Sequence, residues 1–249
     1  MIAVTKFCDF PAEVKKLPKV GGLVDRSYEA IFALKPDLII ATKEGEDVRR
    51  KLQVTGAQVL FVKQDTVEDI LTGIKILAKA VGTETKGEEI VSSARKEMAE
   101  LSARLSNRVR PRVLLSAASE RSTAKLVNII IAGPKTYLGE LLELAGGQNV
   151  YQGNIPYPTI SAEAIIALNP EVVIELLPDT IAEGLNPELQ GPVTPEEIRA
   201  AWQELSVLHF NNKAKIHVLR AEYTVNPGPR FVKTLKDIAQ IIHPDTMPQ

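Results

Sequence analysis

Two stretches of this chain carry nearly the same sequence, and this internal repeat limits the folds that the chain can adopt. Ser27–Ile40 and Ser161–Ile174 are identical at eight of fourteen positions, and three more positions differ conservatively. Each copy predicts a short helix that begins after a serine cap, then a proline, then an apolar run typical of a buried parallel strand. The repeat therefore predicts two α/β lobes, and a cleft between two lobes is a common site for a small molecule.

The bulk composition is compatible with two domains and disfavours several functions. With 249 residues, 45% of them apolar, the chain can fill two hydrophobic cores. Thirty basic against thirty-one acidic residues, with no long run of one sign, lead us to expect no nucleic-acid partner. A single cysteine, Cys8, excludes an internal disulfide. No apolar stretch is long enough to span a bilayer, and Met1–Lys6 lacks the pattern of a signal peptide.

Apolar runs alternate with helical patterns along most of the chain, which is typical of βαβ units and parallel sheets. The candidate strands are Ile2–Thr5, Asp37–Ala41, Gln58–Val62, Arg112–Ser116, Glu171–Leu176 and Lys215–Leu219. Helices are predicted over Thr66–Val81 and Glu196–Leu208, and the second carries the only tryptophan, Trp202. We interpret the proline-rich stretch Pro178–Pro195 as a surface excursion of the second lobe without a functional role.

One long helix is predicted between the two lobes. Within Thr83–Asn107, apolar residues recur at spacings of three and four, so they form one narrow stripe. A helix of this length extends over about 35 Å and could join the lobes as a single rod. The predicted organisation is an N-terminal lobe over 1–82, a linking helix over 83–108 and a C-terminal lobe over 109–249, each lobe being a Rossmann-like α/β fold with a parallel sheet.

The sequence lacks the motifs of several enzyme classes. It contains no dinucleotide-binding glycine motif, no phosphate-cradling loop and no Gly-x-Ser-x-Gly elbow. The three histidines, His209, His217 and His243, all fall near the C-terminal end, so we expect no dedicated metal site that draws on both lobes. We therefore predict a protein with no catalytic residue and no cofactor. A two-lobed enzyme such as a glycosyltransferase remains a distant alternative, because it would need a phosphate loop or a paired acid and base.

Five groups of segments, in this order and spacing, resemble the substrate-binding proteins of ABC importers for cobalamin and ferric siderophores. These groups are Phe7–Pro11, Leu17–Gly21, the two Ser-x-Glu-Ala-Ile units, Ala132–Pro134 with Leu141–Asn149, and Pro227–Arg230. The resemblance covers essentially the whole chain. It implies two α/β lobes joined by one long helix, as in class III periplasmic binding proteins, with a ligand in the cleft and little closure on binding.

The resemblance also implies a set of ligand-binding residues. They are Phe7, Asp9, Phe10, Leu23, Lys43, Ile130, Tyr157, Glu222 and Tyr223. Aromatic faces suit a corrin ring, because a flat and partly apolar macrocycle gains by burial and stacking. The implied ligand is a corrinoid, most simply cobalamin, although this chain has Leu23 and Thr42-Lys43 where the best-known cobalamin binders place tryptophans. A ferric siderophore or haem is the alternative, and haem is disfavoured because Gly22 stands where haem-binding relatives usually carry a tyrosine that binds iron.

The two glutamates of the repeat, Glu29 and Glu163, have a specific meaning in these proteins. The equivalent residues project from the two lobes and pair with arginines of the membrane permease, which implies an ABC permease as partner of a monomeric binding protein. The alternative is that each carboxylate only complements the dipole of its helix, which contributes about 0.3–1 kcal/mol.

The resemblance also concerns the start of the chain and its location. Similar proteins begin with a strand and a helix that precede Ile2–Thr5, so we expect the first lobe to lack them, to expose apolar surface and to lose stability. The implied location is periplasmic or extracellular. A lipid anchor in a full-length protein remains open, and this chain carries no signal peptide.

Overall fold

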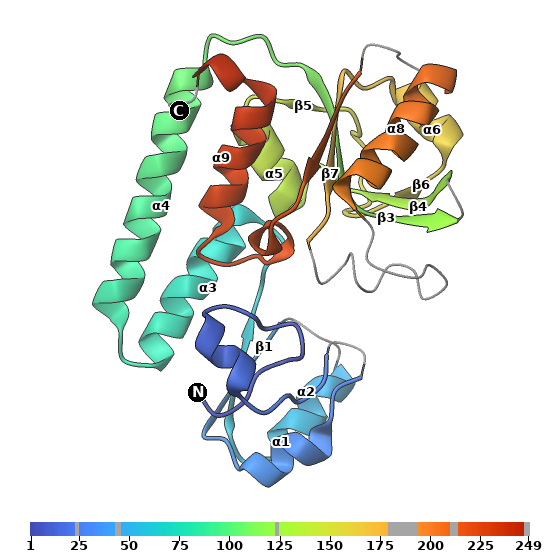
Figure 1. Ribbon diagram of the computed structural model, residues 1–249. Coiled ribbons are helices and arrows are strands. Elements are labelled where there is room, and N and C mark those ends of the chain that lie inside the picture. Colours follow the sequence, from blue (N-terminus) through green and yellow to red (C-terminus); the bar gives the residue numbers. More distant parts are fainter. Residues whose placement is uncertain (23–24, 43–45, 123–124, 179–193, 210–213, 247–249) are drawn as a thin grey trace. The chain divides into compact units, whose positions relative to one another are not determined.

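The computed structural model is a mixed α/β protein (Figure 1). It describes residues 1–22, 25–42, 46–122, 125–178, 194–209 and 214–246. The chain divides into two compact units, Met1–Lys63 and Gln64–Gln249, which are described separately below. This division places the helix α3 (Val67–Ala80) in the second unit, whereas the sequence predicted a first lobe that extends to residue 82. The division into lobe, linking helix and lobe stays a prediction.

The first unit contains a two-stranded parallel sheet with short helices. Its elements are η1 (Ala12–Lys16), α1 (Tyr28–Leu34), β1 (Leu38–Thr42), α2 (Glu46–Gln53) and β2 (Gln58–Val62). Leu38 of β1 pairs with Gln58 of β2, as parallel strands joined by a helical crossover do. The predicted strand Ile2–Thr5 is wrong. In this segment only Val4 forms a parallel bridge, to Lys19. The residues beside Val4 do not extend this bridge into a ladder, so no strand forms.

The second unit is built on a six-stranded mixed sheet in the order β6-β4-β3-β7-β8, with β5 also paired to β3. Its strands are β3 (Arg112–Ser122), β4 (Lys125–Ile131), β5 (Gln148–Asn149), β6 (Thr159–Ile160), β7 (Val172–Leu176) and β8 (Lys215–Leu219). The predicted parallel arrangement is confirmed for β3, β7 and β8, whereas β4 runs antiparallel to β3 and β6. The sequence analysis missed β4, whose apolar run is interrupted by Asn128 with a φ of 49°.

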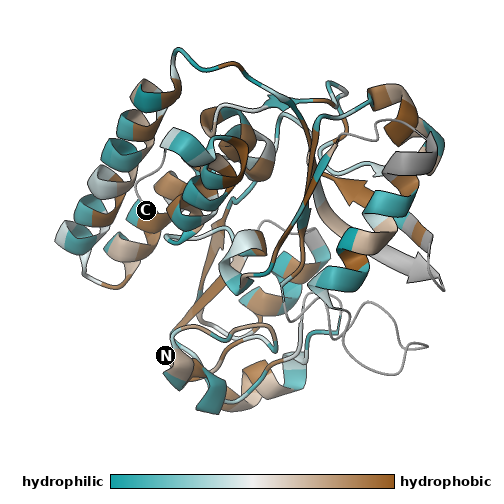
Figure 2. Cartoon of the chain, turned by 45° about the horizontal axis from the view of Figure 1, so that its top comes forward, coloured by the Kyte–Doolittle hydropathy of each residue, from teal (hydrophilic) through white to brown (hydrophobic). Residues whose placement is uncertain are grey.

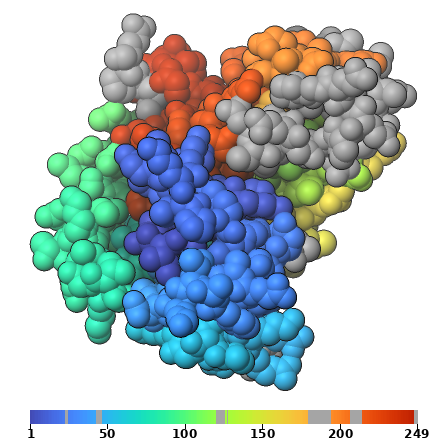
Figure 3. Space-filling model, turned by 60° about the horizontal axis from the view of Figure 1, so that its bottom comes forward, coloured from blue at the N-terminus to red at the C-terminus, as the bar shows by residue number. Residues whose placement is uncertain are grey.

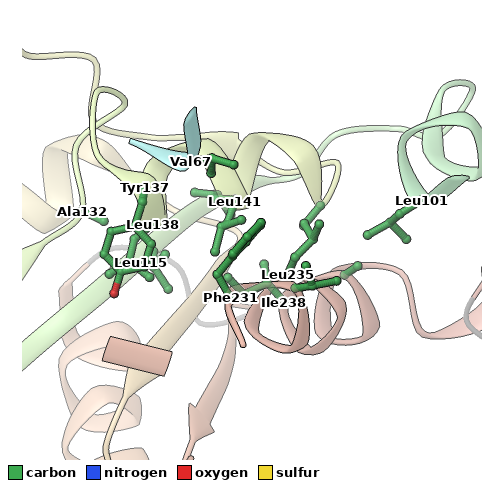
Figure 4. Packing of buried hydrophobic residues seen from close by; sticks show 14 of the residues in the cluster. Val67, Leu101, Leu115, Ala132, Tyr137, Leu138, Leu141, Phe231, Leu235 and Ile238 are labelled. Carbon is green, nitrogen blue, oxygen red and sulfur yellow. The ribbon is translucent and has the colours of Figure 1, made fainter. Parts of the chain in front are cut away.

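Helices cover both faces of this larger sheet, and each face has its own hydrophobic core (Figure 2). The helices are α3, α4 (Glu84–Leu105), α5 (Tyr137–Leu144), α6 (Ala162–Leu168), α8 (Pro195–His209) and α9 (Phe231–Ile242), with short turns η2 (Glu222–Val225) and η3 (Pro244–Thr246). On one face, α3, α4, α5 and α9 pack around Leu141, Phe231 and Leu235 (Figure 4). On the other, α6 and α8 pack around Ile165 and Trp202. Full burial of one such side chain contributes about 1.5–3 kcal/mol.

The long helix α4 follows its predicted apolar stripe closely. Val91, Ala94, Leu101 and Leu105 are buried, with Ile90 and Met98 partly buried against the same core. Atoms of α4 appear in green at the left of Figure 3. No helix in the described ranges combines the length and the apolar character that a membrane crossing requires.

Both copies of the repeat fold into the same helix-strand unit, as the sequence predicted. The Ser27 hydroxyl accepts a hydrogen bond from the Ala30 amide at 3.2 Å, and the Ser161 hydroxyl accepts one from the Ala164 amide at 3.4 Å. Each helix ends at a residue in the left-handed conformation, Lys35 with a φ of 46° and Asn169 with a φ of 42°. A proline follows in each copy, and the strands β1 and β7 begin two residues after it.

Candidate functional site

In the first unit, the predicted ligand-binding aromatics lie on an exposed segment. Phe7 is 51% exposed and Phe10 is 60% exposed, with Asp9 half-buried between them. The ammonium of Lys6 lies 5.1 Å from the centroid of the Phe7 ring, which places a cation beside one aromatic face. The segment therefore offers apolar ring surface next to both a positive and a negative group. The predicted residues Leu23 and Lys43 lie outside the described residues.

A tight turn supports this aromatic segment. The Gly22 amide donates to the Asp25 carboxylate at 3.0 Å, and Lys6 donates to the same carboxylate at 2.8 Å. The hydrogen bond from Lys6 is the main reason that the pKa of Asp25 is lowered. A Cβ atom on Gly22 would lie 2.8 Å from the Phe7 ring, so a larger residue would displace the Phe7 side chain. The position of Phe7 thus depends on a glycine at position 22.

In the second unit, the loop before α5 holds the segment that carries Tyr157. The Gly133 amide donates to the Pro156 carbonyl at 2.7 Å, and the Ile131 amide donates to the Pro158 carbonyl at 3.1 Å. A Cβ atom on Gly133 would lie only 2.7 Å from the Ile155 carbonyl oxygen. The two backbones therefore approach as closely as a glycine permits, and Tyr157 lies between two fixed prolines.

Tyr157 and the turn η2 are both attached to the first turn of α5. Tyr157 is 40% exposed, and burial raises the pKa of its hydroxyl while a hydrogen bond with Thr136 acts in the opposite direction. Thr136 also caps α5, because its hydroxyl accepts from the Gly139 amide at 3.0 Å. The buried hydroxyl of Tyr137 donates to the Thr224 carbonyl of η2 at 3.2 Å. These bonds bring the region of Tyr157 and the region of Glu222 and Tyr223 to the same helix end.

Tyr223 makes strong contacts with α9. Its hydroxyl donates to the Asp237 carboxylate at 2.6 Å, and burial together with this carboxylate raises the pKa of Tyr223 to about 12. Arg230 and Lys233 place cations 5.9 Å and 5.7 Å from the centroid of its ring. Tyr223 is therefore already engaged within the unit, and its role toward a ligand stays a prediction. Glu222, one residue before it, is half-buried.

The remaining predicted residues lie on β4, α1 and α6. Ile130 is half-buried on β4 and pairs with Thr159, two residues after Tyr157. Glu29 and Glu163 are both exposed in the first turns of the matched helices α1 and α6. The structure thus groups Ile130, Tyr157 and η2 in the second unit, and Phe7, Asp9 and Phe10 in the first.

Some features of the second unit were not assigned from the sequence. Thr136, Gly133 and Gly139 organise the loop that holds Tyr157, and a Cβ atom on Gly139 would lie 2.0 Å from the Gly133 carbonyl oxygen. Part of their signal lies in the Ala132–Pro134 motif, which indicates the family resemblance but not this role. Glu175 is also buried in β7, where the sequence predicted an apolar strand.

A groove of about 540 Å³ lies between α4 and α9. It is lined by Lys86, Glu89, Ile90, Ser93, Ala94, Glu97, Pro229, Arg230, Val232, Lys233 and Lys236. None of the predicted ligand-binding residues lines this groove. Within the described part of the chain, no three His, Cys, Asp or Glu side chains are grouped so that they could hold a metal ion.

The sequence matches known proteins over most of its length. A sequence model of the family described as periplasmic binding protein matches residues 1–186. A vitamin B12-binding protein of Vibrio parahaemolyticus serotype O3:K6 (strain RIMD 2210633) is 25% identical over 244 residues, which are 96% of this chain and 80% of the relative. The uncharacterized ABC transporter substrate-binding lipoprotein YvrC of Bacillus subtilis (strain 168) is 23% identical over 255 residues, covering 99% of this chain and 74% of the relative.

The fold is also similar to that of solved structures. A periplasmic heme binding protein from Pseudomonas aeruginosa has a TM-score of 0.77 at 22% identity, with 100% of this chain and 86% of that chain covered. The periplasmic vitamin B12 binding protein BtuF of Vibrio cholerae has a TM-score of 0.73 at 20% identity, with 97% and 87% covered. At these identities the likeness shows the shared fold. Because the family model covers most of the sequence, this chain belongs to the periplasmic binding protein family, whose members are binding proteins of transporters and not enzymes.

Proposed function

We propose that this chain is the substrate-binding component of an ABC importer and that it captures a corrinoid, most simply cobalamin. The observation that carries the proposal is the presence of exposed aromatic side chains in both units, Phe7 and Phe10 in one and Tyr157 in the other. Ring faces such as these suit a flat macrocycle. The vitamin B12-binding relative, aligned over 96% of this chain, supports the same ligand class.

A ferric siderophore or haem is the second candidate within the same family. The heme binding protein among the solved structures shares the fold, which favours no ligand at 22% identity. This chain has Gly22 where the resemblance leads us to expect an iron-binding tyrosine in a haem binder, so we favour the corrinoid.

The proposal is tested by titration calorimetry with cyanocobalamin, haemin and a ferric hydroxamate complex in parallel. We expect saturable binding of cyanocobalamin with one ligand per chain and much weaker binding of the two iron complexes. Phe10→Ala and Tyr157→Ala, each of which removes one exposed ring, should both weaken binding, whereas the exposed Lys79→Ala in α3 should not. Saturable binding of an iron complex without binding of cyanocobalamin would contradict the proposal.

Trp202 is a poor probe for this titration. Its side chain is fully buried in α8, and its indole nitrogen donates to Glu175 at 3.1 Å. A change in its fluorescence would report on the core between α8 and the sheet rather than on contact with a ligand. Heat of binding or the visible absorbance of the corrinoid is therefore the better signal.

We further propose that the protein works as a monomer on the outer side of the cytoplasmic membrane and docks on a permease through Glu29 and Glu163. Both carboxylates lie in the first turn of a serine-capped helix, and both are exposed. The lipoprotein name of the Bacillus subtilis relative supports an outer location and is compatible with a lipid anchor in a full-length form. This proposal does not depend on the strand and helix that precede Ile2–Thr5 in similar proteins.

A further inference from the structure

A buried carboxyl group lies in the core between the sheet and α8. The side chain of Glu175 on β7 is fully buried, as are its neighbours Trp202 and Ser116, and Ser119 is 2% exposed. Ser119 donates to one carboxylate oxygen at 2.7 Å and the Trp202 indole donates to the other at 3.1 Å, while Ser116 forms a further hydrogen bond with the group. In the other copy of the repeat, the equivalent strand position is Ala41, so the helix-strand unit does not itself require an acid there.

The described groups that face Glu175 are uncharged. Its neighbours in the sheet are Ser116 of β3 and Val218 of β8, and α8 presents Trp202. The nearby cations Arg199 of α8 and Lys215 of β8 act on His217, whose pKa is lowered first by burial and then by these charges. Because a buried carboxylate without an opposite charge is costly, burial raises the pKa of Glu175 to about 7, against the hydrogen bonds that lower it.

We infer that Glu175 is a pH-dependent positioning residue, which acts through Ser119 on the irregular part of β3 and β4 beside Ile130, one of the proposed ligand-binding residues of the second unit. This inference rests on the proposed function for the identity of those side chains. The geometry that supports it is the irregular pairing of β3 with β4. The register shifts on both sides of Ala118, and Ala118 pairs with Ile130. Ser119 is the next residue, so its hydroxyl holds the irregular stretch beside Ile130.

The hydrogen-bond donors around Glu175 explain how a proton would act. The ionised carboxylate accepts from both Ser119 and Trp202. An indole N–H can only donate, so a protonated carboxyl group keeps its carbonyl oxygen toward Trp202 and carries its hydroxyl on the oxygen that faces Ser119. The acceptors beside this hydroxyl are Ser119 and Ser116, both on β3, so protonation rearranges the hydrogen bonds of β3. The contacts that change are thus on β3. The neighbouring strand β4 carries Ile130, and Ile130 pairs on its other side with Thr159 of β6.

Stability and ligand affinity should depend on pH in opposite directions. The folded pKa of Glu175 lies above its unfolded value, so between about pH 4.5 and pH 7 the folded protein binds more protons, and stability falls as the pH rises. The ionised group, by contrast, holds Ser119 in the arrangement described here. We therefore expect affinity for cyanocobalamin to rise between pH 5.5 and 8.5, by roughly fivefold or more. If Glu175 had only a structural role, stability would change with pH but the affinity for cyanocobalamin would not rise.

The experiment combines backbone-amide NMR with calorimetry between pH 5.5 and 8.5. In the unaltered chain, the Trp202 indole and the amides of Ser119, Ile130 and Thr159 should shift with one common midpoint. Glu175→Gln presents an amide that accepts from Trp202 and donates to Ser119, so it mimics the protonated form. This variant should abolish the common midpoint and hold affinity at its low-pH level, whereas Ser119→Thr, which keeps the hydroxyl, should retain the pH dependence.

The matched control is Glu204→Gln, which neutralises an exposed carboxylate on the same helix α8 and should leave the titration unchanged. The inference is overturned if Trp202 shifts with pH while Ile130 and Thr159 do not, or if Glu175→Gln keeps the common midpoint. If cyanocobalamin binds at no pH, the proposed function fails, and the amide titration still decides whether Glu175 acts on β3 and β4.

Discussion

The two copies of the repeat make the same local structure in very different surroundings. At matched positions, Ile40 of β1 is 51% exposed, whereas Ile174 of β7 is completely buried. The reason is the number of neighbouring strands, because among the described residues β1 pairs only with β2, whereas β7 lies between β3 and β8 under helices on both faces. Serine caps and left-handed helix ends thus follow from local sequence, but the stability of each copy follows from the sheet around it.

The largest expected difference between the copies is in their strands. Ile174→Ala should lower the free energy of unfolding by about 2–5 kcal/mol, because it leaves a cavity in a packed core. Ile40→Ala should cost under about 1 kcal/mol, because half of that side chain is already in contact with water. Urea unfolding followed by circular dichroism measures both. Equal losses of unfolding free energy would contradict the difference in burial between Ile40 and Ile174.

The next largest difference is expected between two glycines, Gly22 beside Phe7 and Gly133 beside the segment that carries Tyr157. A Cβ atom on Gly133 would collide with backbone carbonyls, whereas one on Gly22 would meet the ends of side chains. Gly133→Ala should therefore displace Tyr157 and weaken cyanocobalamin binding more strongly than Gly22→Ala, which Phe7 can accommodate by a small shift. Calorimetry on both variants ranks them. A larger loss from Gly22→Ala would indicate that the first unit dominates binding.

The serine caps should behave alike in the two copies. Ser27→Ala and Ser161→Ala each remove one acceptor for a helix amide, at a cost of about 0.5–2 kcal/mol. Ser27→Asp and Ser161→Asp serve as controls, because aspartate also caps helices. Thermal unfolding of the four variants gives the comparison. A cost at only one serine would mean that the unit tolerates the loss of a cap differently in its two settings.

The smallest effect on stability is expected at the two docking glutamates. Glu29→Gln and Glu163→Gln should change stability by at most about 0.3–1 kcal/mol and leave cyanocobalamin affinity unchanged, because both carboxylates are exposed. Cobalamin uptake by cells that depend on this protein should nevertheless fall for each variant and further for the pair. Unchanged uptake in the double variant would argue that these carboxylates serve only their helices.

Much of the fold could be predicted from the sequence because it depends on local patterns. The repeat, the long helix α4 and five of the six candidate strands follow from periodicity, caps and prolines. The exception, Ile2–Thr5, failed because only Val4 finds a partner, in Lys19. The strand β4 was missed because Asn128 breaks its pattern at a position where the backbone takes a positive φ.

The candidate site was less accessible to sequence reasoning. The exposure of Phe7, Phe10 and Tyr157 agrees with their expected roles, but their contact with a ligand stays a prediction. Tyr223 was expected from its position alone, and only the structure shows its bond to Asp237. The carboxyl group of Glu175 is surrounded by side chains from separate segments of the chain, so the local sequence could not indicate its hydrogen-bond partners.

We propose that exposed aromatic side chains of both units take part in corrinoid binding. Hydrogen–deuterium exchange with and without cyanocobalamin tests it most directly, because backbone protection can be read for each unit in the intact protein. Cyanocobalamin should slow exchange both in the segment around Phe7 and Phe10 and in the segment around Tyr157 and Glu222. Protection confined to one unit, or centred on the groove between α4 and α9, would contradict it.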